Sequence, residues 1–170
     1  MLQTTYIIRF NDCDPFGHLN NSKYIDYMLN AREDHLRQHH QLKLDDFYKQ
    51  GIAWVVSQHE ICYARPANYN ETVCIESDLI EVGDTDLVVE MRMFDETCTT
   101  LKALMWTRFT SVNIKTGRRE AHTSEFLELL NTLKVDHIDT PQGIRARLKV
   151  FSHPRTHSNA VPVAGNDHPA

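Results

Sequence analysis

One stretch of the chain decides how the fold is predicted: Arg9-Phe10-Asn11-Asp12-Cys13-Asp14-Pro15-Phe16-Gly17-His18-Leu19-Asn20-Asn21-Ser22-Lys23-Tyr24-Ile25-Asp26-Tyr27. The part up to Asn21 is rich in Asp, Asn, Pro and Gly, which is typical of a loop. From about Ser22 to His39, apolar residues recur at three- and four-residue steps, which predicts an amphipathic helix. Either Asn21 or Ser22 is a suitable N-cap. Ahead of the loop, the residues from about Thr4 to Asn11 indicate a first strand.

Downstream of the helix, the apolar pattern changes to strand-like segments bounded by turns. It predicts strands over Ile52–Tyr63, Glu71–Ile80, Asp86–Phe94 and Thr99–Ile114, with short helices over Asp45–Gln50 and Ser124–Leu133. One long helix followed by a run of antiparallel hairpins is an α+β arrangement. We therefore expect one domain in which a curved antiparallel sheet wraps around one long central helix.

Length and composition narrow the class of protein. A chain of 170 residues suits one domain, and its formal net charge of −5 does not indicate a nucleic-acid-binding protein. The N-terminus lacks the features of a signal peptide, and no apolar run is long enough to span a membrane. The four cysteines show no CxxC spacing, which disfavours a zinc or redox motif. We expect a cytoplasmic protein with reduced thiols, no metal, and neither a nucleic acid nor a membrane as partner.

The last part of the chain differs from the rest. Residues 137–170 hold four of the six prolines and four of the ten histidines. We interpret residues 1–136 as the domain and residues 137–170 as a C-terminal extension that is partly extended or mobile. Within it, Ile144–Phe151 alternates at period two and favours an added strand.

The loop before the long helix carries the chemistry. Asp14 precedes the expected helix start, and His18 follows Asp14 by four residues. The free N–H groups and the dipole of a helix N-terminus favour negative charge, so they could polarise a thioester carbonyl. A carboxylate facing that carbonyl could activate water or attack directly. The competing interpretation is structural, because Asp often closes an Asx-turn and Asn often caps a helix.

The same residues closely resemble the signature of the 4-hydroxybenzoyl-CoA thioesterase-like branch of the hot-dog superfamily, which leads directly into a central helix. The match is dense at Asp12, Asp14, Gly17, His18, Asn20, Asn21 and Tyr24. It implies a single hot-dog domain up to about Leu133 and hydrolysis of acyl-CoA to a free acid and CoA.

The resemblance also implies roles for individual residues. Asp14 takes the place of the catalytic carboxylate, as general base or nucleophile, and His18 is a candidate for orienting water or substrate. Gly17, Asn20, Asn21 and Tyr24 are the candidate substrate-binding residues. Asn21 stands where several bacterial members have a His. The plant acyl-ACP thioesterases have an Asn where this chain has Phe16, so the sequence departs from their pattern.

Two alternative functions remain open at this stage. The first is an acyl-CoA-binding hot-dog protein without turnover. The second is an enoyl-CoA hydratase, although the hydratase motif spaces its Asp and His five residues apart. No cofactor is expected, since coenzyme A is part of the substrate. Because the family pairs its sheets between subunits, the resemblance implies a homodimer or a homotetramer.

Overall fold

The computed structural model describes residues 2–39, 42 and 44–153. Five strands form one antiparallel sheet in the order β1-β3-β4-β5-β2. The strands are β1 (Leu2–Ile7), β2 (Ile52–Tyr63), β3 (Thr72–Val82), β4 (Asp86–Asp95) and β5 (Leu101–Asn113). The α-helices are α1 (Asn21–His39), α2 (Leu44–Lys49), α3 (Ser124–Leu133) and α4 (Gly143–Lys149), and Phe10–Asp12 and Thr140–Gln142 are short 3₁₀ helices.

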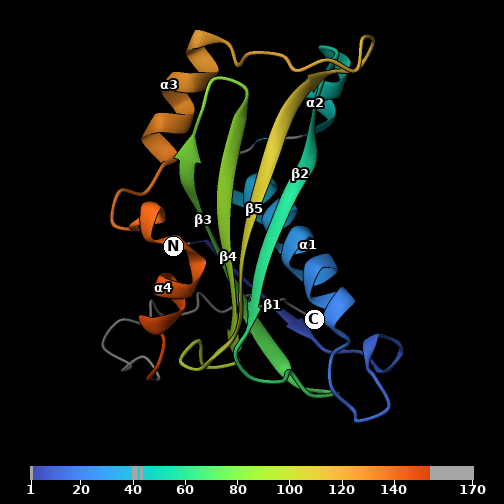
Figure 1. Ribbon diagram of the computed structural model, residues 1–170. Coiled ribbons are helices and arrows are strands. Elements are labelled where there is room, and N and C mark those ends of the chain that lie inside the picture. Colours follow the sequence, from blue (N-terminus) through green and yellow to red (C-terminus); the bar gives the residue numbers. More distant parts are fainter. Residues whose placement is uncertain (1, 40–41, 43, 154–170) are drawn as a thin grey trace, which may run out of the picture.

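The long helix α1 packs on one face of the curved sheet (Figure 1). This inner face is apolar because alternate residues of the strands point to the same side. Ile75, Met91 and Met93 from the strands are fully buried against Tyr24 and Met28 of α1. The expected hot-dog arrangement, with one central helix in a curved antiparallel sheet, is confirmed.

The opposite, outer face of the sheet is covered by the segment after residue 136. α4 lies on the side of the sheet away from α1 (Figure 1). Ile144 of α4 and Phe151 pack with Phe94 and Trp106 of the strands, so the central strands are buried on both faces. The strand expected over Ile144–Phe151 is wrong, because residues 143–149 form a helix. Ile144 and Leu148 are four residues apart, so both meet the sheet from one side of α4.

The segment before the long helix also differs from the sequence prediction. β1 ends at Ile7 rather than near Asn11, because the chain turns into the 3₁₀ helix that begins at Phe10. The ladder of β1 with β3 accordingly stops at the pair of Ile7 with Thr72. The other strands and the two short helices α2 and α3 agree with their predicted positions to within a few residues. The expectation of an extended or mobile end falls largely on residues 154–170, which lie outside the described residues.

A disulfide joins Cys74 on β3 to Cys98 in the turn between β4 and β5. This differs from the expectation of four reduced thiols. The two cysteines are 24 residues apart in sequence, but their Cα atoms are 5.6 Å apart because the turn folds back over β3. Cys13 and Cys62 are free thiols.

Candidate functional site

The loop between β1 and α1 is folded back on itself as a small hairpin. An isolated bridge pairs Cys13 with Leu19, and the N–H of Asp14 donates to the carbonyl of His18 at 2.7 Å. Gly17 occupies the tip with φ of +77°, a left-handed conformation that favours glycine. The hairpin therefore holds the Asp14 backbone in one position.

Asp14 is partly exposed, and one of its carboxylate oxygens is fixed by the backbone. Oδ1 accepts the N–H of Phe16 at 2.9 Å and the N–H of His18 at 3.1 Å. This is the Asx-turn of the structural interpretation. Among the described residues, Oδ2 has no hydrogen-bond partner. The same carboxylate can therefore shape the loop with one oxygen and present the other to a ligand.

A second loop, residues 66–70, supports the first. Leu19 N–H donates to the carbonyl of Ala67, and Tyr69 N–H donates to the carbonyl of Gly17, both at 2.8 Å. His18 forms an isolated bridge with Asn68. The His18 side chain is half-buried and lies four residues from Asp14 within this hydrogen-bonded pair of loops.

The start of α1 is capped by Asn20. Its Oδ1 accepts the backbone N–H of Ser22 at 3.1 Å and the Ser22 hydroxyl at 2.9 Å. The predicted N-cap, Asn21 or Ser22, is thus displaced by one or two residues. The carbonyl of Asn21 accepts the Tyr63 hydroxyl at 2.9 Å. Within the described chain, the N–H of Asn21 has no partner, so it is a free donor at the positive end of the helix.

Tyr24 connects the first turn of α1 to the second loop. Its side chain is buried, and its hydroxyl oxygen accepts the N–H of Ala67 at 3.0 Å. Burial raises the pKa of Tyr24, and the charges of Glu71 and Asp14 act in the same direction. Tyr24 therefore links the helix start to the second loop, and its role in substrate binding stays a prediction.

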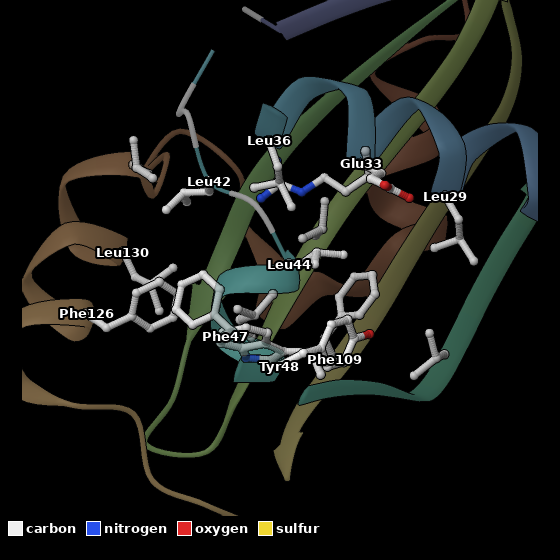
Figure 2. A pocket seen from close by; sticks show the side chains of 16 residues that line it. Leu29, Glu33, Leu36, Leu42, Leu44, Phe47, Tyr48, Phe109, Phe126 and Leu130 are labelled. Atoms are coloured by element: carbon white, nitrogen blue, oxygen red, sulfur yellow. The ribbon is translucent and has the colours of Figure 1, made fainter. Parts of the chain in front are cut away.

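Sequence reasoning missed a cavity at the other end of α1. It has a volume of about 230 Å³ and lies between α1, α2, α3 and the inner face of the sheet (Figure 2). Arg32 is one of the residues that line it. In the sequence, Arg32 falls among the apolar residues that recur at three- and four-residue steps along the helix. A charged residue within an apolar stripe was the available signal. Within the described residues, no group of three or more His, Cys, Asp or Glu side chains is placed to hold a metal ion, and no helix has both the length and the apolar character to span a membrane.

The similarity to known proteins covers most of the chain. Residues 8–148 match a family model described as the thioesterase-like superfamily. No curated protein sequence matches significantly. The solved structures provide three informative neighbours.

The first neighbour is the probable thioesterase YbaW from Escherichia coli, with a TM-score of 0.69 and 24% identity over 79% of this chain and 100% of that one. The second is Slr0204, a 1,4-dihydroxy-2-naphthoyl-CoA thioesterase from Synechocystis, with a TM-score of 0.69 and 14% identity over 78% of this chain and 96% of that one. The third is a 12:0-ACP thioesterase from Umbellularia californica, with a TM-score of 0.70 and 15% identity over 82% of this chain and 53% of that one. At these identities the neighbours show the fold.

Proposed function

The chain belongs to the thioesterase-like superfamily, and from that premise we propose that it hydrolyses acyl-CoA thioesters at the loop that carries Asp14. Thioester hydrolysis in general follows from the family. The choice of acyl-CoA as substrate and of Asp14 as the reacting group is the proposal. The observation that carries it is the Asp14 carboxylate itself, fixed through Oδ1 and open at Oδ2.

Asp14 acts as a general base or as a nucleophile. In the first route, Oδ2 takes a proton from water while the water oxygen attacks the thioester carbonyl carbon. The C–S bond then breaks, and the proton passes to the leaving CoA thiolate. In the second route, Oδ2 attacks the carbonyl carbon, the C–S bond breaks and CoA leaves as the thiolate. Water then hydrolyses the resulting anhydride to the free acid and the Asp14 carboxylate, and the proton released from water passes to the CoA thiolate. Neither route requires a metal or an organic cofactor.

The N-terminus of α1 supplies the electrophilic partner. The Asn20 side chain accepts the N–H of Ser22 and not that of Asn21, so the Asn21 N–H is available to the substrate. A donor aimed at the developing oxyanion lowers the barrier more than one that binds the ground-state carbonyl. His18 orients the water or the substrate from the same hairpin. Gly17, Asn20 and Tyr24 contribute by holding the hairpin and the helix start in place.

A second copy of the chain is the partner we propose, as a homodimer or a homotetramer. β2 lies at one edge of the sheet, and edge strands present unpaired backbone groups. Val55, Val56 and Tyr63 on this strand are exposed apolar side chains, and Tyr63 also contacts Asn21 at the site. Pairing at β2 would therefore place the partner beside the catalytic loop. Light scattering in solution would measure the assembly, and a monomer would contradict it.

The catalytic proposal is tested with a panel of acyl-CoAs and measurement of the thiol released. Asp14→Asn keeps an oxygen for the Phe16 and His18 amides but removes the charge. It should therefore fold normally and lose roughly 10²- to 10⁴-fold in kcat/KM. The matched control is Asp95→Asn, because Asp95 Oδ1 likewise accepts two backbone N–H groups, from Thr99 at 2.9 Å and Thr100 at 3.2 Å. The control should keep full activity.

Each other outcome identifies a different function. Equal thiol release by wild type and Asp14→Asn would contradict the role of Asp14. Tight acyl-CoA binding without thiol release would indicate a binding protein. Loss of enoyl absorbance without thiol release would indicate a hydratase.

A further inference from the structure

The cavity beside the C-terminal half of α1 is large and apolar (Figure 2). Its volume of about 230 Å³ exceeds the roughly 150 Å³ of an apolar cavity that holds benzene. Five aromatic residues line it: Phe47, Tyr48, Trp54, Phe109 and Phe126. A space of this kind accepts the apolar body of a small ligand.

Two charged residues, Arg32 and Glu33, also line the cavity, and Arg32 is the buried one. Its side chain is only 9% exposed, and the described residues offer the guanidinium a single hydrogen bond, from Nη1 to Ser77 Oγ at 3.4 Å. No described carboxylate lies within ion-pairing distance of it. Arg37, about one turn further along α1, differs from Arg32 in both respects, because it is exposed and forms an ion pair with Glu33 at 2.6 Å.

The charge on Arg32 is poorly compensated on its own side of the sheet. Burial lowers the pKa of Arg32 to about 10, and the charge of Asp78 opposes this effect. Asp78 belongs to the outer face, where it pairs with Arg92 at 2.5 Å. Arg32 therefore stays protonated at neutral pH inside an apolar space. Buried charges are rare unless paired, so an anionic ligand would complete this environment.

Resting on the thioesterase function proposed above, we propose that the cavity holds the acyl group of the substrate and that Arg32 binds a carboxylate at its distal end. The preferred substrates are then monothioesters of dicarboxylic acids. A guanidinium presents a planar fork of donors that matches a carboxylate. The first residue of α1 and Arg32 are eleven positions apart, which is roughly 16 Å along the helix. This separation suits a long acyl chain between the thioester and the distal group.

The kinetic test compares acyl-CoAs that differ only at the distal end. Octanedioyl-CoA is compared with octanoyl-CoA, and dodecanedioyl-CoA with dodecanoyl-CoA, through kcat/KM for thiol release. Wild type should prefer the dicarboxylic member of at least one pair by roughly tenfold to hundredfold, the usual effect of a hydrogen bond to a charged group. Arg32→Met should abolish that preference, and Arg32→Lys should retain part of it. Arg37→Met is the matched control and should keep the wild-type preference.

A binding test separates this inference from the catalytic proposal, because it needs no turnover. Monomethyl octanedioate carries one free carboxylate, and methyl octanoate carries none. Their affinities are measured by calorimetry and by the fluorescence of Trp54, which lines the cavity. Wild type and Arg37→Met should bind the first ligand more tightly, and Arg32→Met should not.

The catalytic proposal and the assignment of the cavity can fail independently of each other. If no acyl-CoA is hydrolysed but the carboxylate ligand binds through Arg32, the cavity assignment stands and the catalytic proposal falls. If acyl-CoAs are hydrolysed but wild type treats both members of every pair alike, the role of Arg32 is overturned. That role is equally overturned if Arg32→Met, shown to be folded by its circular dichroism, leaves the preference unchanged. Arg32 would then be a structural residue held by Ser77 and the charge of Asp78.

Discussion

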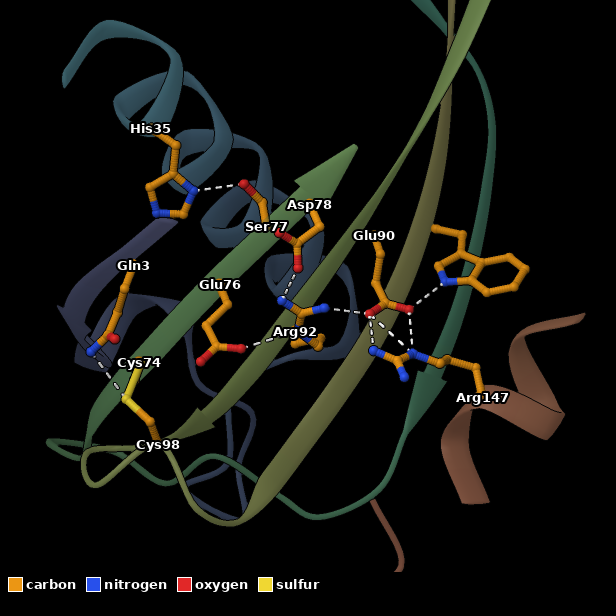
Figure 3. A network of polar contacts seen from close by, with 11 residues as sticks. Gln3, His35, Cys74, Glu76, Ser77, Asp78, Glu90, Arg92, Cys98 and Arg147 are labelled. Atoms are coloured by element: carbon orange, nitrogen blue, oxygen red, sulfur yellow. Dashed lines mark hydrogen bonds and ion pairs between the residues drawn. A yellow bond between two sulfur atoms is a disulfide. The ribbon is translucent and has the colours of Figure 1, made fainter. Parts of the chain in front are cut away.

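Arg147 on α4 reaches Glu90 in the middle of β4, with Nη2 of Arg147 2.9 Å from Oε1 of Glu90 (Figure 3). The Glu90 side chain is fully buried and also pairs with Arg92 at 2.5 Å. Arg92 in turn contacts Glu76 and Asp78. The segment after residue 136 is thus joined to the sheet by a buried ion pair as well as by apolar packing.

Arg147→Met should lower the free energy of unfolding by roughly 2 kcal/mol. Breaking a buried pair usually costs about 3–5 kcal/mol, but here Arg92 still compensates Glu90. Urea unfolding followed by circular dichroism measures the change. The control is Arg145→Met on the same helix, because Arg145 is exposed. An equal loss in both variants would contradict a specific role for the pair.

The stability of the protein should also depend on pH through Glu90. Burial alone would raise the pKa of Glu90, but the hydrogen bonds from Arg147 and the charge of Arg92 hold it below its ordinary value of 4.5. A lowered pKa in the folded state stabilises the fold above about pH 4.5, and this contribution is lost as the pH falls through the folded-state pKa. The stability difference between wild type and Glu90→Gln should therefore be largest near neutral pH and narrow below about pH 4.5. A constant difference across this range, measured by urea unfolding, would contradict the assignment.

Much of the sheet was predictable because one face of the strands packs into the apolar core that they share with α1. The inner face carries every second residue of β3 and β4, including Val73, Ile75, Met91 and Met93. The residues between them point to the outer face. The outer face is harder to predict, because it carries charged residues such as Glu90 and Arg92, and charged side chains are usually exposed. They are buried because α4 covers them, and α4 itself was taken for a strand. A contact between segments as distant in sequence as β4 and α4 produces no periodic pattern in the sequence of either segment.

The candidate site was only partly predictable for a related reason. Asp14 and His18 belong to a short continuous motif, so their proximity follows from the loop itself. The Arg32 cavity is assembled from three helices and the sheet, and its residues are spread from Leu29 to Leu133. In the sequence Arg32 is one member of an amphipathic pattern. Its burial and its weak compensation emerge only when these elements pack together.

The two adjacent asparagines at the start of α1 should differ in their effect on stability. Asn20→Ala removes the oxygen that accepts the N–H and hydroxyl of Ser22, so it should cost about 1 kcal/mol in unfolding free energy. Asn21→Ala should cost close to nothing, because the Asn21 side chain is exposed and makes no hydrogen bond within the described chain. Thermal unfolding of both variants tests the assignment of the cap. A larger effect at Asn21 would place the cap there instead.

His18 provides the sharpest test of how the loop divides structural and chemical roles. Its backbone N–H holds Asp14 Oδ1, whereas its side chain is proposed to orient water or substrate. His18→Ala keeps the backbone contact, so the melting temperature should change little while kcat/KM for acyl-CoA falls by roughly 10- to 100-fold. This loss is smaller than that expected for Asp14→Asn, because positioning contributes less than the reacting carboxylate. If His18→Ala loses stability in parallel with activity, the side chain supports the loop and takes no part in the reaction.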